Sequence, residues 1–210
     1  MAKQKQMKVL VACEFSGIVR EAFAARGWNA WSCDLLASER IGQHIQGDVL
    51  WLLDAANFDL MIAHPPCTYL AVSGARYFSE RVREQGEALD FVRSLLDAPV
   101  KYIALENPVG VISSRIRKPD QIVQPWMFGH SESKKTCLWL KNLPPLSPTN
   151  VLALPEGGRW QNQTPTGQNN IGPSADRWKM RSRTYTGIAD AMAEQWTSFI
   201  QASERSERYD

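Results

Sequence analysis

The chain has 210 residues, of which 44% are hydrophobic and 22% charged, and 24 Lys+Arg against 22 Asp+Glu leave a net charge of only +2. This composition is that of an ordinary globular protein, so it excludes a disordered or fibrous chain and a protein that coats nucleic acid by bulk charge. The length suits one domain, or one domain with a small lobe.

The sequence indicates neither a membrane-spanning nor a secreted protein. No apolar run approaches the roughly 20 residues that a membrane span requires, and the charged start of the chain leads into a strand-like run rather than a signal peptide. The cysteines and the three histidines are scattered without any CxxC pair, so neither a zinc site nor a disulfide framework is predicted. We therefore expect a soluble, cytoplasmic protein that binds no metal.

Strands and helices alternate over the first half of the chain. Buried strands are predicted at residues 8–13, 28–33, 58–63 and 101–105, and helices at residues 18–26 and 79–96. This alternation predicts right-handed crossovers and an α/β fold with a doubly wound, mostly parallel sheet. A later strand at 136–140 and a final helix at 188–200 complete the predicted elements.

The pattern divides the chain into four parts. We expect a core at residues 1–141, a reduced substrate-recognition loop or small lobe at 142–183, a C-terminal helix returning to the core at 184–202, and a flexible tail at 203–210. From residue 159 to 183, five Lys or Arg residues oppose one Asp, a local charge of +4.

This basic segment is also accompanied by aromatic residues, namely Trp160, Trp178 and Tyr185. Positive charge beside stacking surfaces is typical of a nucleic-acid groove. The alternative is a solvated loop whose tryptophans pack on the domain.

Polar side chains follow the predicted strands at the point where each strand ends, namely Glu14, Asp34, His64, Cys67 and Glu106. Because ligands of such sheets bind beyond the carboxyl ends of the strands, we expect these residues to line one cleft. The small turn Ser16-Gly17 precedes a helix whose backbone N–H groups would cradle a nucleotide-like ligand, although the G-x-G-x-x-G pattern is absent. Each aspartate could instead cap a helix or a turn.

Cys67 is the predicted nucleophile. Pro65 and Pro66 keep the preceding chain extended and aim the cysteine into the cleft. We expect its thiol to be exposed at an electropositive strand end, which favours the thiolate. Glu106, at the end of the next strand, can hydrogen-bond a pyrimidine amino group and share a proton with a ring nitrogen. The other cysteines are interpreted as buried filler.

In this order the motifs resemble those of the cytosine-C5 DNA methyltransferases. Phe15-Ser-Gly17 resembles their first glycine loop, Asp34 their ribose carboxylate and Gly47-Asp48 their adenine-edge motif. Pro65-Pro-Cys67 resembles the Pro-Cys nucleophile motif, and Glu106-Asn107 resembles the Glu-Asn motif that binds the flipped base. Phe128-Gly129 with Lys134 and the 136–140 strand resembles a later motif, and residues 186–196 resemble the C-terminal one. The resemblance covers residues 8–140 and roughly 183–200 and suits a small, phage-type member without a large target-recognition domain.

The resemblance implies a Rossmann-like fold that uses S-adenosylmethionine to methylate C5 of cytosine in DNA through a covalent bond between Cys67 and C6. The implied catalytic residues are Cys67, Glu106 and Asn107. The implied cofactor contacts are Phe15, Ser16, Gly17, Asp34, Leu35, Asp48, Val49, Pro66 and Gly187. We expect contacts to DNA, or to another cytosine-containing nucleic acid, from Lys134, Arg177, Arg181 and Arg183.

Departures from the family pattern keep alternatives open. The shortened recognition segment allows the same chemistry on single-stranded nucleic acid, RNA or a free cytosine nucleotide, and a non-catalytic binding module is a further alternative. The amino-methyltransferases share Pro-Pro at this strand end but carry an aromatic residue where this chain has Cys67, so C5 chemistry is favoured. His64 could tune the thiolate, contact phosphate or serve only the turn.

Overall fold

The computed structural model describes residues 6–55, 57–165, 170–172 and 174–207. Its strands are β1 Lys8–Ala12, β2 Asn29–Asp34, β3 His44–Gln46, β4 Leu60–Ala63, β5 Tyr102–Pro108, β6 Gln121–Val123 and β7 Thr136–Lys141. Its α-helices are α1 Ile18–Ala24, α2 Leu50–Ala55, α3 Val82–Leu96, α4 Ile112–Arg115, α5 Arg177–Ser182 and α6 Thr186–Ser206. Two 3-10 helices, η1 Val72–Glu80 and η2 Pro125–Met127, complete the elements of the described residues.

The strands form a seven-stranded sheet in the order β3-β2-β1-β4-β5-β7-β6. β1 to β5 are parallel, whereas β7 runs antiparallel to β5 and to β6. The predicted doubly wound, mostly parallel sheet is confirmed, and the short strands β3 and β6 escaped prediction. The strand order reverses between β1 and β4, and in such sheets the crevice at this switch point binds ligands.

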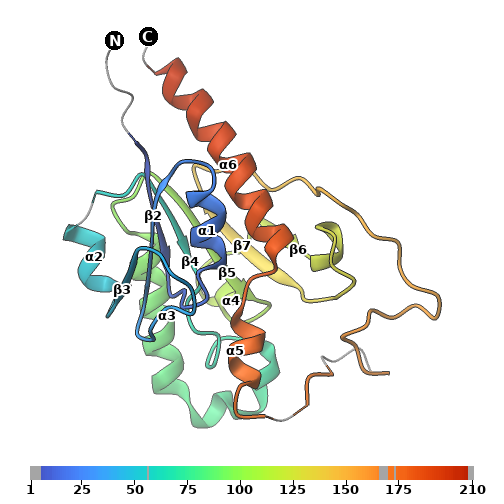
Figure 1. Cartoon of the computed structure of the whole chain (residues 1–210). Coiled ribbons are helices and arrows are strands. Elements are labelled where there is room, and N and C mark those ends of the chain that lie inside the picture. Colours follow the sequence, from blue (N-terminus) through green and yellow to red (C-terminus); the bar gives the residue numbers. More distant parts are fainter. Residues whose placement is uncertain (1–5, 56, 166–169, 173, 208–210) are drawn as a thin grey trace.

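Alternate residues of each strand pack into two cores, one on each face of the sheet. In β1, Val9 and Val11 pack with helices α1 and α6, whereas Leu10 and Ala12 pack with α2, α3 and α4 on the other face. This period of two is what a strand buried on both faces produces. Figure 1 shows α6 lying beside α1 on one side of the sheet and α3 on the other.

Several boundaries differ from the predicted ones. The predicted helix 79–96 divides into η1, which ends at Glu80, and α3, which begins at Val82. The final helix runs past residue 200 to Ser206, so the described part of the predicted tail is helical up to that point, while 208–210 lie outside the described residues. An ion pair of 2.7 Å between Lys101 Nζ and Glu207 Oε1 ties the end of α6 to the sheet. None of the helices in the described residues is long and apolar enough to cross a membrane.

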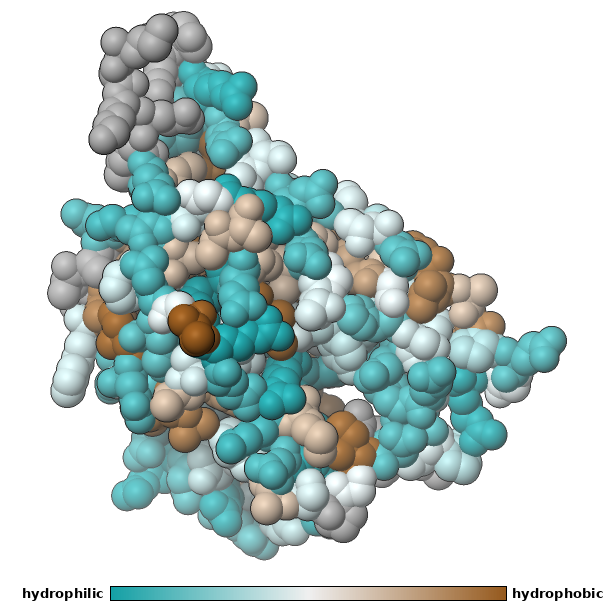
Figure 2. Space-filling view, viewed as in Figure 1, coloured by the Kyte–Doolittle hydropathy of each residue, from teal (hydrophilic) through white to brown (hydrophobic). Residues whose placement is uncertain are grey.

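The segment after β7 leaves the body of the domain and returns to it at α5, as Figure 1 shows in orange. Trp160 of this segment is buried and its ring stacks on Trp126, with ring centroids 5.9 Å apart and planes inclined by 2°. The Trp160 indole therefore packs on the domain, as expected if the basic segment is a solvated loop whose tryptophans pack rather than a nucleic-acid groove. Figure 2 shows that hydrophilic side chains cover most of the visible face and that this face is hollowed between the body and the projecting segment.

Candidate active site

A cavity of about 520 Å³ opens at the carboxyl ends of β1, β2, β3 and β4, against one face of α3. Its volume is within the usual range for small-molecule sites. Cys13, which follows β1, lines it with a backbone φ of 58°, a left-handed conformation that is uncommon for a residue other than glycine. Such strained positions concentrate at functional sites.

The charge of this cavity identifies the kind of ligand that it suits. Four acidic residues line it, namely Asp34, Asp48, Glu84 and Glu87, and none of the described lining residues is Lys or Arg. This lining favours a cationic ligand and disfavours one that carries phosphates. The acidic side chains do not converge on one point, because no group of three or more His, Cys, Asp or Glu among the described residues could hold a metal ion.

The N-terminus of α1 is occupied by the protein itself. Glu14 is buried, and its two carboxylate oxygens accept hydrogen bonds from the backbone N–H groups of Val19, at 2.7 Å, and Arg20, at 3.2 Å. The prediction that these N–H groups cradle a nucleotide-like ligand is therefore wrong, because an internal carboxylate already satisfies them.

The predicted cofactor residues fall into two groups. Asp34, Leu35, Asp48, Val49 and Pro66 line the cavity, which brings together three separate loops. Each of the two aspartates also accepts a backbone hydrogen bond in its own turn, from Leu36 at 2.9 Å and from Leu50 at 3.0 Å. Turn capping and ligand binding are thus compatible at these positions, because a carboxylate has lone pairs for several donors.

Phe15, Ser16, Gly17 and Gly187 are not among the residues that line this cavity. The ring of Phe15 instead lies 5.8 Å from that of Trp178 on α5. A Cβ on Gly187 would lie 2.0 Å from the carbonyl oxygen of Phe128, so this glycine allows α6 to approach the chain closely. The structure gives these residues packing contacts.

The sequence interpretation missed the helical wall of the cavity. Glu84, Glu87, Ala88 and Phe91 follow one another on one face of α3, at the spacing of a helical stripe. This spacing can be seen in the sequence, but acidic residues on a helix face do not by themselves indicate a cavity wall.

Cys67 and Glu106 are brought together by a hydrogen bond between their neighbours. The side-chain amide of Asn107 is buried and donates to the carbonyl oxygen of Pro65 at 2.8 Å. Strand β5 extends to Pro108, so Glu106 lies within the strand, opposite Leu138 of β7, rather than in a loop after it. The buried Asn107 side chain therefore holds the segment of Pro65 and Cys67 against strand β5.

Glu106 is held as a carboxylate. Burial opposes its ionisation, but the hydrogen bond with His64 and the positive charge of Lys134 outweigh burial and hold the pKa of Glu106 below its usual value. The Thr136 hydroxyl adds a further hydrogen bond in the same direction. The carboxylate thus needs a proton before it can donate one to a substrate.

Cys67 is the exposed cysteine among the four free cysteines, which all lie in described residues. Burial of the sulfur and the charge of Glu106 raise the pKa of the Cys67 thiol, although Lys134 and Arg181 lower it in part. The expectation that this strand end favours the thiolate is wrong for the protein without substrate, because the nearby carboxylate and desolvation prevail. Burial, followed by Asp34 and Asp48, raises the pKa of Cys33 to about 11, which leaves that thiol inert.

The predicted substrate contacts lie in different settings. Lys134 Nζ donates to the carbonyl oxygen of Arg181 at 2.7 Å, and the charges of both residues act on Cys67. Arg177 begins α5. Arg183, in contrast, makes a two-pronged ion pair with Glu39, at 2.8 and 3.1 Å. That pairing ties the end of α5 to the loop after β2 and leaves Arg183 little capacity for a phosphate.

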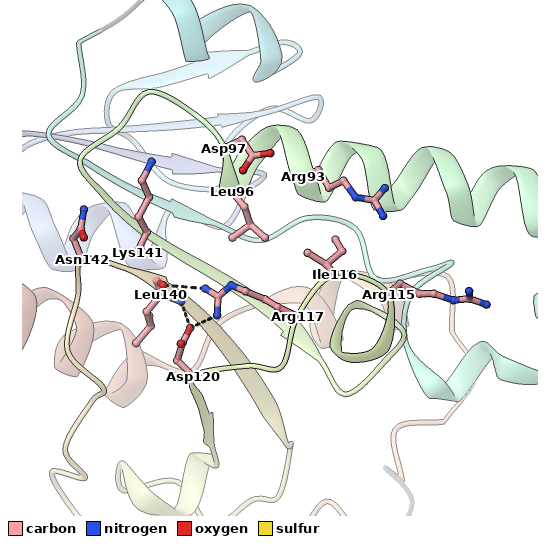
Figure 3. A pocket seen from close by; sticks show the side chains of 10 residues that line it. All are labelled: Arg93, Leu96, Asp97, Arg115, Ile116, Arg117, Asp120, Leu140, Lys141 and Asn142. Atoms are coloured by element: carbon pink, nitrogen blue, oxygen red, sulfur yellow. Dashed lines mark hydrogen bonds and ion pairs between the residues drawn. The ribbon is translucent and has the colours of Figure 1, made fainter.

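A larger cavity, of about 810 Å³, lies at the opposite edge of the sheet, between the end of α3 and the end of β7. Figure 3 shows Arg117 turned toward Asp120 and Leu140. The guanidinium groups of Arg93 and Arg115 point away from the Arg117–Asp120 pair. The Arg117 guanidinium lies 2.7 Å from an Asp120 carboxylate oxygen and donates to the Leu140 carbonyl at 2.9 Å. The cavity holds none of the predicted site residues.

No protein-family model matches the sequence, and no curated protein matches it. Among solved structures, Entamoeba histolytica methyltransferase EhMeth matches with a TM-score of 0.50 and 16% identity, over 71% of this chain and 58% of that one. A structure described as a DNA modification methyltransferase encoded within an Escherichia coli prophage matches with a TM-score of 0.42 and 13% identity, over 68% and 53% of the two chains. The 16S rRNA methylase RmtB matches with a TM-score of 0.34 and 15% identity, over 65% and 56%.

The chain thus spans between half and three fifths of the length of these structures. At 16% identity, the similarity to EhMeth concerns the fold. Together with the seven-stranded, mostly parallel sheet, it identifies the fold of this protein as a Rossmann-like methyltransferase fold, which confirms the predicted fold class.

Proposed function

We propose that this protein transfers a methyl group from S-adenosylmethionine to C5 of cytosine in DNA, through a covalent bond between Cys67 and C6. One observation carries the proposal. The Asn107–Pro65 hydrogen bond brings an exposed cysteine and a partly buried glutamate together, beside a cavity whose lining suits a cationic nucleoside. Nucleophile, proton carrier and cofactor cavity thus meet at the carboxyl edge of one sheet.

S-adenosylmethionine suits the cavity because it carries a sulfonium charge and lacks phosphates. Asp34 and Asp48 are the candidates for its hydroxyl and amino groups, and Leu35, Val49 and Phe91 supply apolar surface. When bound, it supplies an electrophilic methyl group. The remaining chemistry falls to the protein side chains.

Cys67 and Glu106 divide the work on the pyrimidine. With the target base turned out of the stack, the Cys67 thiolate adds to C6 and makes C5 nucleophilic. Glu106 hydrogen-bonds the amino group and delivers a proton to N3, which prevents negative charge from building on the ring. After methylation the C5 proton leaves to water, the S–C6 bond breaks, and N3 returns its proton.

Lys134, Arg177 and Arg181 are proposed to contact the nucleic-acid backbone. Trp178, with about half of its side chain exposed at 51%, adds a stacking surface on α5. Arg183 and Trp160 are already held by Glu39 and Trp126, respectively. This small free contact surface favours a second candidate substrate, cytosine in single-stranded nucleic acid.

The test is methyl transfer from labelled S-adenosylmethionine to duplex DNA, single-stranded DNA, RNA and cytidine triphosphate. Digestion of the product then identifies the modified base. We expect 5-methylcytosine from a DNA substrate. Label in another base, or in none of the four substrates, contradicts the proposed chemistry, and label in free nucleotide or RNA alone contradicts the DNA assignment.

A further inference from the structure

His64 is placed against Glu106 by the sheet itself. It follows the last residue of β4, its backbone N–H donates to the carbonyl of Ala12 at 2.9 Å, and its Nδ1 lies 3.4 Å from Glu106 Oε2 on the neighbouring strand β5. Both side chains are enclosed, with 8% of the His64 side chain and 16% of the Glu106 side chain exposed. The pair is thus built into rigid elements.

The protonation of the pair follows from its partners. Because Glu106 is ionised, it accepts, and Nδ1 of His64 must carry the shared hydrogen. The other ring nitrogen, Nε2, is buried and has no hydrogen-bond partner among the described residues. An imidazole held at one nitrogen and unpartnered at the other can take up and release a proton without breaking a second contact.

The proposed reaction creates a need for such a group. Glu106 must protonate N3 as Cys67 adds to C6, yet the carboxylate holds no proton of its own in the free protein. We propose that His64 is a positioning residue that fixes the Glu106 carboxylate and supplies, through Nδ1–H, the proton that Glu106 passes to the substrate ring. The role rests on the proposed function.

The proton balance closes over one turnover. As the S–C6 bond forms, Glu106 takes the Nδ1 proton of the His64 imidazolium and passes a proton to N3. Glu106 is then again a carboxylate, and His64 is a neutral ring with its hydrogen on Nε2. On elimination of Cys67, the N3 proton returns to Glu106 and then to His64.

Other charged or titratable groups face Glu106 from two directions. Lys134 acts on it from the segment before β7, and Cys137 of β7 and Cys67 after Pro66 are the thiols that its charge reaches. Lysine and cysteine side chains ordinarily titrate at higher pH than histidine, whose ordinary range lies near neutral pH. The test therefore varies the pH as well as the residue at position 64.

The test compares His64→Asn with His64→Ala in single-turnover methyl transfer from about pH 6 to about pH 9. An asparagine amide reproduces the Nδ1–H donor but cannot titrate. We expect both variants to be about 100-fold slower than the wild type at about pH 8. The deficit narrows as the pH falls, because solvent then protonates Glu106 directly. A purely structural histidine would be rescued by asparagine at every pH, and that result overturns the proposal.

Nitrogen-15 NMR of the histidine ring separates this proposal from the proposed function. We expect the neutral His64 ring to carry its hydrogen on Nδ1, and the signal of that hydrogen to be lost in Glu106→Ala. This pattern supports the pair even if no substrate is methylated, an outcome in which the proposed function alone fails. A neutral His64 ring that carries its hydrogen on Nε2 alone in the free protein overturns the role of His64, whether or not methyl transfer occurs.

Discussion

The two cavities at opposite edges of the sheet differ in whether their charged side chains face the cavity or are paired within the protein. At the carboxyl edge, Asp34 and Asp48 face a cavity that no Lys or Arg of the described residues lines. At the opposite edge, the cavity is larger, but its Arg117 is paired with Asp120, and Lys141 donates to the carbonyl of Ala98 at 3.1 Å. The cations of the larger cavity are largely engaged in holding the fold.

This difference teaches that volume does not locate the chemistry in a doubly wound sheet. Parallel strands deliver the side chains that follow them to one edge, and the order reversal between β1 and β4 opens a crevice there. The opposite edge receives helix ends and the end of β7, which bring backbone groups to be satisfied rather than convergent reactive groups.

Removing the thiol of Cys67 is expected to give the largest effect. Cys67→Ala should abolish the covalent adduct with DNA containing 5-fluorocytosine and lower methyl transfer at least about 1000-fold, because no other exposed thiol in the described residues can replace it. Gel shift under denaturing conditions measures the adduct. The matched control, Arg117→Ala at the opposite edge, should form it at the wild-type rate. An adduct that survives Cys67→Ala contradicts the assignment of the nucleophile.

The next largest effect is expected when one acidic side chain of the smaller cavity loses its charge. Asp34→Asn keeps the side-chain oxygen that accepts the Leu36 N–H but removes the charge, so we expect S-adenosylmethionine to bind about 10-fold to 100-fold more weakly. Equilibrium dialysis measures the dissociation constant. Asp97→Asn in the opposite cavity is the control and should leave it unchanged. Equal losses in the two variants would break the contrast between the cavities.

The charges of Glu106 and Lys134 at the carboxyl edge should affect the reactivity of Cys67. The Glu106 carboxylate raises the pKa of the thiol and Lys134 lowers it, and only the thiolate reacts with iodoacetamide. Glu106→Gln should therefore move the midpoint of alkylation to lower pH, and Lys134→Met should move it to higher pH. Mass spectrometry of the Cys67 peptide measures this without any substrate. Arg117→Met should move nothing, and two shifts of the same sign would refute the stated electrostatics.

The fold could be predicted from the sequence because each long strand is buried on both faces and reads as a continuous apolar run. β3 and β6, with three residues each, are too short for that signal, and they exist because long neighbours offer an edge. The end of α6 was not predicted either, because residues 203–206 are polar and are held in the helix by local bonds and the Lys101–Glu207 pair.

The motifs of the candidate site could be predicted from the sequence, whereas the contacts and electrostatic interactions between its side chains could not. Asp34, Asp48 and Pro66 line the cavity because strand ends converge, a rule that sequence order reveals. The carboxylate that occupies the N-terminus of α1 and the upward pKa shift of Cys67 depend on distances between side chains, for which spacing along the chain gives no measure. The sequence predicts His64 and Glu106 at neighbouring strand ends, but their contact at 3.4 Å depends on side-chain orientations that the sequence order does not give.

The smallest effect is expected at the opposite edge. Asp120→Asn weakens an ion pair whose side chains are 40% and 38% exposed, and solvent screens such pairs, so the free energy of unfolding should fall by less than about 1 kcal/mol. The asparagine oxygen can still accept from the backbone N–H of Leu140, which now donates to Asp120 at 2.6 Å. Urea unfolding measures the change, and the rate of adduct formation should equal that of the wild type. If this variant instead lost the adduct, the larger cavity would be linked to the reaction, and its charges could no longer be interpreted as serving the fold alone.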